Sequence, residues 1–587
     1  MPLDKIYWCH ECGIPILSDK CRHGHSKIKY CSTDLKPVFK IEKELYEKSL
    51  KIELPDHQYL FRNSNRIIFG GKTLFRFSTA YNSTKKGGDK YSLIGIEPNE
   101  KIIANIKKHG RLIQNNFKNG VDYWNYLVDE NQAEMDKFIL ESNTFIQDTL
   151  ANYKTDNVYI SFSGGKDSVA VAHLIKKLGL DIPLFMSDTT LEYPETYKFV
   201  REFAEKYDFN LVDYTKYKSE QNFFELCKEL GPPSIFYRWC CTVFKSYPVN
   251  KFYQEIEGDI LTFDGIRKLE SKRRSKYEQV SRIKKIPRQI ASYPIFHWRE
   301  FDVWFYILSQ GIDYNPLYNY GHTRVGCYLC PAASPSNCTF RKIINYDLWK
   351  QFEELLYEYA ERAKRRTEDG THITWIDKNY WRLRRPKKDR ITTGTVGKLK
   401  GQADPFFFES TQKICSSDNT YLYKFGKKNL IDAGNIRNEE GRFVNKKEID
   451  KAEQIKIDKN FLEFLKPFGD VKITPILGKD IFQIIKGNPL SVMGFLEGEQ
   501  LKVTFNPDTF LQSKKLFERQ IRKAMNCVAC GGCIGTCPSN AISIINNRYT
   551  IDKSKCDHCL ICVKTQFVSN GCIALNFNLR MKVLENI

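Results

Sequence analysis

The stretch Asn157-Val158-Tyr159-Ile160-Ser161-Phe162-Ser163-Gly164-Gly165-Lys166-Asp167-Ser168 is followed by an apolar-periodic run from Val169 to Leu178. Its first six residues alternate and are β-prone, whereas the apolar residues of the following run recur at helical spacing. The Ser-Gly-Gly-Lys-Asp-Ser turn is therefore predicted to join a strand to a helix, and anions bind at such junctions.

This turn carries the chemistry of an anion site. Adjacent glycines let backbone N–H groups point at one ligand, and the helix N-terminus adds partial positive charge. We expect Ser168 to cap the helix and Lys166 to reach a phosphate. The turn differs from the Gly-x4-Gly-Lys-Ser/Thr loop of kinases. It resembles the pyrophosphate loop of ATP pyrophosphatases, which activate a substrate by adenylylation. The predicted nucleotide contacts are Ser163, Gly164, Gly165, Lys166, Asp167 and Ser168.

Length, charge and cysteine usage limit the classes of protein to which this chain can belong. The 587 residues and 42% hydrophobic content predict several packed domains. A formal net charge of +21 favours anionic substrates or a polyanionic partner. No charged leader or run near ~18 apolar residues is seen, which predicts a cytoplasmic protein without a membrane span. The nineteen cysteines fall mostly in Cys-x2-Cys groups, which favours metal ligation over disulfides.

The first two predicted segments precede the phosphate loop. Residues 1–40 are expected to form a zinc-ribbon-like segment, because Cys-x2-Cys followed by further Cys or His residues can close a tetrahedral zinc site. The predicted ligands are Cys9, Cys12, Cys21 and Cys31, with His23 or His25 as alternatives. Residues 41–125 carry short alternating runs and basic turns, which predict a small β-rich accessory module.

Residues 126–400 alternate strand-like and helical patterns. Strand-like runs lie at 183–188, 210–214 and 259–263, and a helix is expected over 194–206. This alternation predicts an α/β fold with a doubly wound parallel sheet, in which ligands sit at the carboxyl ends of the strands. The phosphate loop and the loop that begins at Gly265 both lie at such ends, so Gly265 and Arg267 are expected to contact the nucleotide.

Further motifs follow in order over about 200 residues. They are Asp188-Thr189-Thr190-Leu191-Glu192-Tyr193-Pro194-Glu195-Thr196, Arg238-Trp239-Cys240-Cys241 with Lys245, Gly265-Ile266-Arg267-Lys268-Leu269-Glu270-Ser271 with Arg274, Trp298 with Asp302, and Tyr314-Asn315-Pro316-Leu317-Tyr318 through Cys327. With the phosphate loop, they resemble the phosphoadenosine phosphosulfate (PAPS) reductase family. The resemblance implies an adenine nucleotide as ligand and a set of catalytic candidates: Lys166, Asp188, Arg238, Arg267 and Arg274. We expect the three arginines to contact phosphate or sulfate groups, because guanidinium groups bind tetrahedral oxyanions bidentately.

A cysteine arrangement within this segment suggests an iron–sulfur cluster. Cys240-Cys241 and Cys327-x2-Cys330 resemble the [4Fe–4S] site of adenylylsulfate reductases. Cys338 is a fifth candidate that could replace Cys240, and spacing alone does not decide between them.

Residues 516–580 are predicted to form a ferredoxin domain. Cys527-x2-Cys530-x2-Cys533-x3-Cys537-Pro538, followed by Cys556-x2-Cys559-x2-Cys562 and Cys572, resembles bacterial two-cluster ferredoxins. The resemblance assigns one [4Fe–4S] cluster to Cys527, Cys530, Cys533 and Cys572, and the other to Cys556, Cys559, Cys562 and Cys537. A nine-residue gap before Cys572, and Ile573 where a Pro is usual, depart from the family pattern.

Two segments carry weaker signals. Residues 362–390 are rich in Arg and Lys with interleaved aromatic residues, which suits nucleic acid (tRNA or DNA) but also a solvated helix or interdomain linker. Residues 401–515 show no chemical motif and are left as an accessory or linker domain. Cys415 stands alone there and is interpreted as a small core residue.

Three functional hypotheses follow. The first is an ATP pyrophosphatase with redox clusters, similar to the sulfurtransferases of DNA phosphorothioation, which activates an acceptor by adenylylation. The second is a sulfonucleotide reductase that makes sulfite with electrons from the fused ferredoxin domain or another electron donor. Two features argue against the second hypothesis. The assimilatory reductases have a degenerate phosphate loop, whereas the loop here is intact, and they carry a C-terminal Glu-Cys-Gly-Thr-type nucleophile, which is not found in this sequence. The third is a nucleic-acid-binding module with a vestigial nucleotide site.

Overall fold

The computed structural model describes the chain in segments. These are residues 5–32, 34–81, 85, 90–283, 286–362, 372–377, 379–383, 406–411, 420–428, 452–454, 459–476, 479–485, 492–497, 500–505, 510–527, 529–546 and 548–564. They belong to two compact units. The first comprises residues 1–216, 256–283 and 288–351, and the second comprises 217–255, 284–287 and 352–587.

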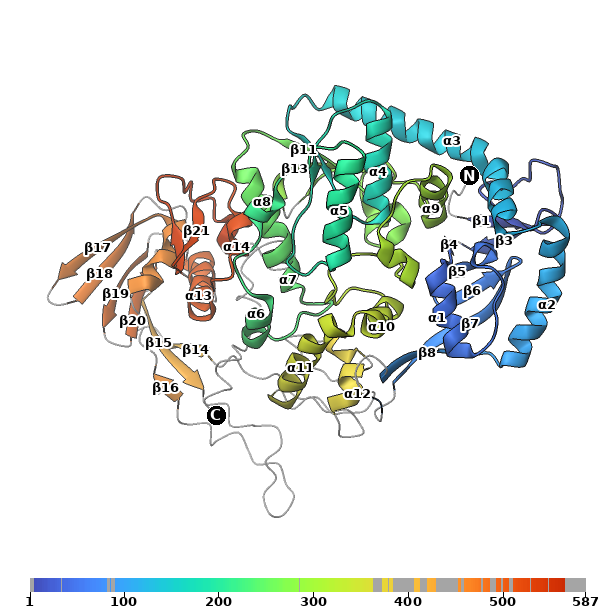
Figure 1. The fold of residues 1–587 in the computed structure, drawn as a ribbon. Helices are drawn as coiled ribbons and strands as arrows, with labels where there is room; N and C mark the ends of the chain where they lie inside the picture. The colour runs from blue at the N-terminus through green and yellow to red at the C-terminus, as the bar shows by residue number, and fades with distance from the viewer. Residues whose placement is uncertain are drawn as a thin grey trace, which may run out of the picture. The chain divides into compact units, whose positions relative to one another are not determined.

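A five-stranded sheet forms the centre of the first unit (Figure 1). Its order is β10-β9-β11-β13-β12, and β9 pairs in parallel with β10 and β11, as β11 does with β13. The strands are β9 (Val158–Ser161), β10 (Leu184–Phe185), β11 (Ile260–Asp264), β12 (Val280–Ile283) and β13 (Ile286–Ser292). The predicted α/β fold with a parallel sheet is confirmed. Strand order reverses between β9 and its two neighbours, so the ends of β9 and β11 form the switch point where ligands bind in such sheets.

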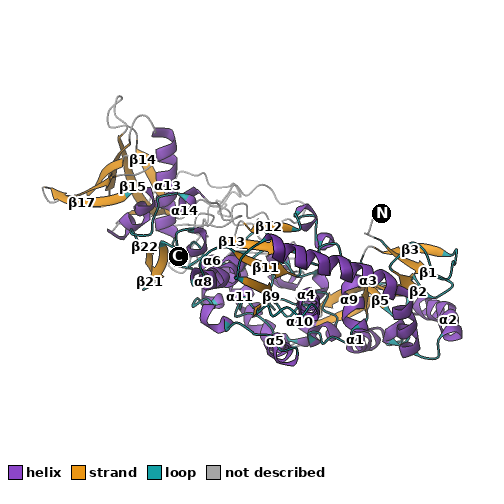
Figure 2. Ribbon diagram, turned by 90° about the horizontal axis from the view of Figure 1, so that it is seen from above, coloured by secondary structure: helices purple, strands orange, loops and turns teal. Residues whose placement is uncertain are grey.

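Helices pack along this sheet. They are α3 (Gly120–Asn152), α4 (Lys166–Lys177), α5 (Pro194–Lys206) and α9 (Glu300–Ser309), whereas α10 (Pro335–Ile344) contacts the antiparallel strands β7 (Lys72–Tyr81) and β8 (Tyr91–Gly95). Helix α4 is buried from Val169 to Ile175 because it contacts β9, β11, α3 and α9, and Figure 2 shows α3 running alongside the strands. Each fully buried Val or Leu there contributes about 1.5–3 kcal/mol. The helix predicted over 194–206 is confirmed as α5.

The strand expected at 210–214 is not formed. Only one bridge, between Leu184 and Leu211, extends the sheet at this point. Strand β10 is only two residues long, so a single residue of it, Leu184, is available for pairing with the segment around Leu211. The Leu184 N–H donates to Asn210 O, and the Leu184 carbonyl oxygen accepts from Val212 N–H. The chain then turns into a 3-10 helix over Tyr214–Tyr217.

Two antiparallel sheets precede the parallel one. The first has the order β2-β1-β3, with β1 (Ile6–Cys9), β2 (Ile14–Ile16) and β3 (Ile28–Ser32). The second runs β4-β5-β6-β7-β8, with β4 (Lys36–Pro37), β5 (Phe61–Asn63), β6 (Arg66–Phe69), β7 (Lys72–Tyr81) and β8 (Tyr91–Gly95). Helices α1 (Lys40–Leu50) and α2 (Asn99–Asn116) contact this second sheet. The alternating sequence pattern did not predict either helix.

The second unit contains a helical segment, an antiparallel sheet and a cysteine-rich end. The helical part comprises α6 (Phe223–Leu230), α7 (Trp239–Cys241), a π-helical turn over Thr242–Ser246 and α8 (Tyr247–Gln254). Helix α11 (Tyr346–Arg362) enters the second unit at Phe352, and α12 (His372–Asp377) follows it along the chain. The sheet has the order β14-β15-β20-β19-β18-β17, with β16 paired to β15. Its strands are β14 (Phe406–Thr411), β15 (Thr420–Lys428), β16 (Ala452–Gln454), β17 (Asp470–Ile476), β18 (Lys479–Ile485), β19 (Val492–Glu497) and β20 (Gln500–Phe505).

The cysteine-rich end follows α13 (Phe510–Asn526) and contains β21 (Ile542–Ile545), β22 (Arg548–Ile551) and α14 (Ile561–Lys564). Phe517, Ile521, Ile542 and Val563 share its buried core. Among the described residues, no helix combines the length and the apolar character that crossing a membrane requires.

Candidate functional site

The phosphate loop links the end of β9 to the first turn of α4. Gly164 has φ +67°, and a Cβ there would lie 3.0 Å from Val200 Cγ2, so both conformation and space favour glycine. The expected cap by Ser168 is wrong. Helix α4 begins at Lys166 with Gly165 at the N-cap position. The Ser168 hydroxyl therefore lies inside the first turn, where it donates to Gly165 O at 2.9 Å and accepts from Ser163 N–H at 3.3 Å.

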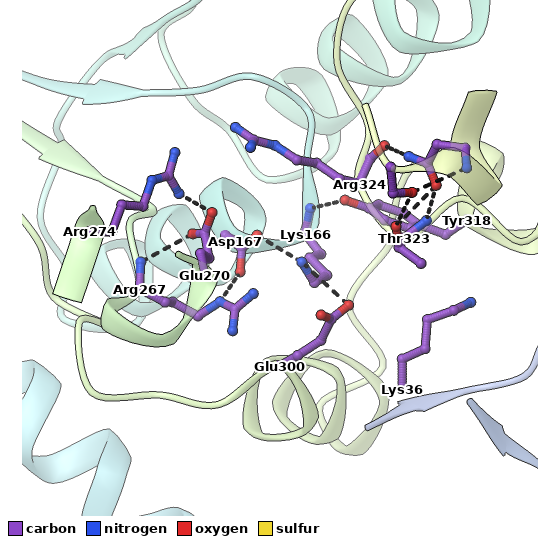
Figure 3. Close-up of polar contacts among 12 residues, drawn as sticks. Lys36, Lys166, Asp167, Arg267, Glu270, Arg274, Glu300, Tyr318, Thr323 and Arg324 are labelled. Atoms are coloured by element: carbon purple, nitrogen blue, oxygen red, sulfur yellow. Dashed lines mark hydrogen bonds and ion pairs between the residues drawn. The ribbon is translucent and has the colours of Figure 1, made fainter. Parts of the chain in front are cut away.

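Charged side chains converge on this loop (Figure 3). Lys166 Nζ lies 2.9 Å from Asp167 Oδ2 and 3.8 Å from Glu300 Oε1. Arg267 Nε donates to Asp167 Oδ1 at 2.6 Å. Burial opposes the charge on Asp167, but Arg267 and Lys166 outweigh it and hold the pKa of Asp167 well below its usual range. The loop lysine and arginine are thus charged and compensated by carboxylates.

The loop after β11 is pressed against the phosphate loop. A Cβ on Gly265 would lie 2.6 Å from the carbonyl carbon of Asp167, so only glycine permits this approach. The backbone N–H of Arg267 donates to Glu270 Oε1 at 3.2 Å, and Arg274 forms an ion pair with Glu270. The structure therefore brings Gly265, Arg267 and Arg274 to the edge of the loop that contains Lys166 (Figure 3).

Asp188 and Arg238 are the other two predicted catalytic residues. Asp188 follows β10 and is buried. Its Oδ1 accepts from Thr190 N–H at 2.7 Å and from the Tyr197 hydroxyl at 2.6 Å, so it shapes its own loop. Arg238 belongs to the second compact unit, where it occupies the N-cap position of α7.

Sequence reasoning assigned no role to four residues that the structure places at this site. Glu300 begins α9, and the Tyr318 hydroxyl accepts from Lys166 N–H at 3.0 Å. Asp34 has its carboxyl group beside that of Glu300. Arg324 extends toward Arg274 in the view of Figure 3. Only Tyr318 had a signal, because it ends the Tyr-Asn-Pro-Leu-Tyr motif.

Cysteines of the parallel-sheet segment fall in both units. Cys327 Sγ lies 3.3 Å from Thr189 Oγ1, and Cys330 follows one turn later. Cys338 is fully buried, with Arg341 Nη2 at 2.8 Å from its sulfur. Cys240 and Cys241 lie in α7 of the second unit. The choice between Cys240 and Cys338 as a cluster ligand stays open.

The C-terminal cysteines surround a cavity. Cys537, Cys556, Cys559 and Cys562 line it together with Pro467, Ala541, Ile542, Ile551, Asp557, His558 and Leu560. These four cysteines are the set that the ferredoxin resemblance assigned to one cluster. Lys523 is fully buried nearby, with Nζ 4.2 Å from the centroid of the Tyr549 ring. Burial raises the pKa of the Cys562 thiol to about 12, and the Lys523 charge acts in the opposite direction. A buried ammonium beside several cysteines fits a centre of anionic thiolates.

The same cysteine-rich end packs on α8 within the second unit. A Cβ on Gly535 would lie 2.1 Å from Asn250 Nδ2, and one on Gly531 would lie 3.6 Å from the Tyr247 ring. Gln254 Nε2 donates to Asn540 Oδ1 at 3.2 Å. The loop that contains Cys530 and Cys533 is therefore held against the helical segment that begins with Cys240 and Cys241.

The N-terminal cysteines form a much tighter group. The ligand atoms of Cys9, Cys12, Cys21 and His25 all lie within 4.8 Å of one another, and Cys31 is not part of this group. A second group shares two of these residues and consists of Cys12, Cys21, His23 and Glu130.

Several predicted residues lie outside the described part of the chain. They are Cys572, Cys415 and most of the basic segment, including 363–370 and 384–390.

Comparisons with known proteins identify the domain around the phosphate loop. Residues 157–333 match the phosphoadenosine phosphosulfate reductase domain. The uncharacterized protein MJ0066 of Methanocaldococcus jannaschii is 31% identical over 376 residues, which cover 59% of this chain and 74% of that protein. An adenosine 5′-phosphosulfate reductase of Geobacillus sp. is 29% identical and matches 32% of this chain and 77% of its own length. A crystal structure of PAPS reductase from Candida auris aligns with 34% of this chain and 97% of its own, at 19% identity and a TM-score of 0.26.

Proposed function

The chain belongs to the same family as the uncharacterized protein MJ0066 and carries a PAPS reductase domain, and from this premise we propose that it is an iron–sulfur enzyme of sulfur metabolism that binds an adenine nucleotide at the phosphate loop. We propose ATP as that nucleotide and adenylylation of a sulfur acceptor as the reaction. The observation that carries the proposal is the intact loop whose Lys166 ammonium lies between Asp167 and Glu300.

The geometry supports transfer of an adenylyl group. An acceptor oxygen or sulfur attacks the α-phosphorus of ATP, the bond between that phosphorus and the bridging oxygen to the β-phosphate breaks, and pyrophosphate leaves. The loop N–H groups and Lys166 bind the departing pyrophosphate, because its negative charge grows as the bond breaks. Arg267 and Arg274 come from the neighbouring loop and are suited to the remaining phosphate oxygens. The carboxylates that pair these cations in the free protein keep them in place until the nucleotide arrives.

The cysteines supply the proposed redox centres. Clusters of the [4Fe–4S] type carry single electrons when bound. Cys537, Cys556, Cys559 and Cys562 around one cavity would hold one cluster, and Cys527, Cys530, Cys533 and Cys572 a second. Cys241, Cys327 and Cys330, with either Cys240 or Cys338, would hold a third, and the N-terminal group would hold zinc.

A second candidate is reduction of a sulfonucleotide. It is favoured by the relatives named adenosine 5′-phosphosulfate reductase, which match this chain at 29% identity or below. In that reaction, two electrons and one proton convert adenylylsulfate to AMP and hydrogen sulfite, as the bond between sulfur and the bridging oxygen breaks. An external donor or the ferredoxin-type clusters, if bound by the C-terminal cysteines, would supply these electrons. A nucleic acid acceptor for the first reaction is a further hypothesis, based on net charge.

One experiment separates the two reactions. Anaerobically purified protein is incubated under one reductant with ATP, adenylylsulfate or PAPS, and released pyrophosphate and sulfite are measured. We expect pyrophosphate from ATP that depends on Lys166. Sulfite from a sulfonucleotide without pyrophosphate from ATP would establish the reductase instead.

A further inference from the structure

The N-terminal ribbon brings four metal-binding side chains to one point. Cys9 and Cys12 flank the turn between β1 and β2, and Cys21 and His25 lie in the loop before β3. Cys12 Sγ is 3.4 Å from Cys21 Sγ. His25 Nδ1 is 3.5 Å from Cys9 Sγ, 3.2 Å from Cys12 Sγ and 3.4 Å from Cys21 Sγ. The backbone N–H of Cys12 donates to Cys9 Sγ at 3.4 Å, so the turn also orients that sulfur.

These separations are close to those of a tetrahedral zinc site. With Zn–S near 2.3 Å and Zn–N near 2.0–2.1 Å, neighbouring S and N ligand atoms of a zinc tetrahedron lie about 3.5 Å apart and neighbouring S atoms about 3.8 Å apart, so small side-chain movements would accommodate the ion. The three cysteines are buried and the imidazole is partly exposed. Among the described residues of the ribbon, Cys31 cannot join them, because Cys9 pairs with Ile28 and Cys31 lies three residues further along β3. At about 3.3 Å per residue, that is roughly 10 Å away.

The ribbon is also tied to the phosphate-loop site. Arg299 Nη1 donates to Lys5 O at 2.6 Å and Leu17 O at 3.2 Å, and Arg299 directly precedes Glu300. The chain leaves the ribbon at Ser32, whose hydroxyl donates to Asp34 O at 2.6 Å. Asn63 Nδ2 donates to the same carbonyl oxygen at 2.6 Å. Asp34 is thus held by the end of the ribbon on one side and by β5 on the other.

We propose that Cys9, Cys12, Cys21 and His25 bind one Zn²⁺, and that the ribbon fixed by this ion positions Asp34 against Glu300 to set the charge around Lys166. The second half of this proposal, the role of Asp34, rests on the proposed nucleotide site. The first half, the zinc site, does not.

Asp34 acts as a positioning residue. The residue as a whole is exposed, but its carboxyl group lies among charged groups from three elements, namely Glu300 of α9, Lys166 of α4 and Arg267 of the loop after β11. Desolvation of this carboxyl group and the adjacent Glu300 carboxylate raise the pKa of Asp34 to about 8. Near neutral pH, the Asp34 carboxyl group is therefore mostly protonated, and its negative charge appears as the pH rises past 8.

Metal analysis of full-length variants tests the first half. Zinc in anaerobically purified wild type should be about one per chain. His25→Ala should lose at least four-fifths of it, whereas Cys31→Ser and His23→Ala should keep it. His25→Cys should restore zinc binding, which separates loss of a ligand from misfolding. Cobalt(II) in the site should give thiolate charge-transfer bands that shift in His25→Cys. Zinc retained in His25→Ala but lost in Cys31→Ser would overturn the assignment, as would wild type without zinc.

Calorimetry with inorganic pyrophosphate tests the second half. The protonation of pyrophosphate changes with pH in the same way for wild type and for Asp34→Asn. The ratio of their two affinities therefore reports only the effect of the Asp34 charge. We expect wild-type affinity to fall three- to tenfold relative to Asp34→Asn between pH 7 and pH 9, and the exposed control Asp19→Asn to follow wild type. A constant ratio would overturn the role of Asp34. If wild type bound neither pyrophosphate nor ATP, the proposed nucleotide site would fail while the zinc assignment stood.

Discussion

The two ends of the chain use the same Cys-x2-Cys spacing but arrange their thiols differently. At the N-terminus, three thiols and one imidazole lie within 4.8 Å of one another. At the C-terminus, four cysteines line a cavity, and among the described residues there they form no group that tight. The same sequence spacing therefore gives two different arrangements of thiols. The tighter group is the one expected for a single ion, and the wider set is the one expected for the proposed cluster.

The largest expected effect is selective metal loss. We expect about twelve iron and one zinc per chain in anaerobically purified protein. Cys559→Ser, at an exposed ligand position, should remove about four iron and leave zinc unchanged. Cys12→Ser should remove zinc and leave iron unchanged. Elemental analysis and the visible absorption of the clusters measure both. Iron near four with zinc near three in wild type would contradict the ferredoxin-type assignment and make the two ends alike.

A nucleotide-site variant should separate binding from metal content. Lys166→Ala removes a charge-assisted contact worth about 1.5–3 kcal/mol, so ATP affinity should fall roughly 10- to 150-fold. The matched control is Lys177→Ala, at the far end of the same helix. Calorimetry with ATP and adenylylsulfate gives the affinities. Iron and zinc should equal wild type, and unchanged affinity for both nucleotides would remove the phosphate loop from the mechanism.

Lys523 tests whether the C-terminal cavity is built for an anionic centre. Lys523→Met keeps the volume and removes the buried charge. Without bound cluster the variant should be more stable than wild type by about 1–4 kcal/mol, because a desolvated ammonium is lost. With cluster bound, the order should reverse and the reduction potential should fall, since a nearby positive charge favours the reduced state. Thermal unfolding of both forms and a redox titration measure this. A variant more stable in both forms would argue against a cluster there.

The smallest effect concerns acid stability around the loop. The pKa of Asp167 is depressed in the folded protein, so its stabilising contribution is complete above the unfolded value near 4 and is lost as the pH falls below it. Between pH 5 and 3, the opening free energy of α4 should fall by about 1 kcal/mol more in wild type than in Asp167→Asn. Amide hydrogen exchange of α4 measures it, with exposed Asp181→Asn as the control. Parallel curves for wild type and Asp167→Asn would contradict the ion-pair account.

Local patterns predicted the frame of the nucleotide site but not its full set of residues. The strand pattern of the sequence predicts that the Gly265 loop lies beside the phosphate loop, because the carboxyl ends of neighbouring parallel strands meet at one edge of the sheet. Glu300, Asp34 and Tyr318 reach the same place from more than 100 residues away along the chain, and no periodicity reports such contacts. The predicted N-cap at Ser168 is wrong because the sequence pattern does not locate the first residue of the helix, and α4 begins at Lys166. Residue type favours Cys31 as a ligand and leaves His23 and His25 as alternatives, whereas the strand register of β3 keeps Cys31 away from Cys9 and the loop before β3 brings His25 to it.

The packing of the cysteine-rich end on α8 has a consequence for synthesis. Asn540 is translated 286 residues after its partner Gln254. At about 5–20 residues per second, the face of α8 that carries Tyr247 waits roughly 15–60 s on the ribosome for the segment that covers it. During that interval the parallel-sheet unit can complete its own core, while α8 stays available to chaperones. The contact between α8 and the cysteine-rich end therefore forms only after the segment around Asn540 has been synthesised.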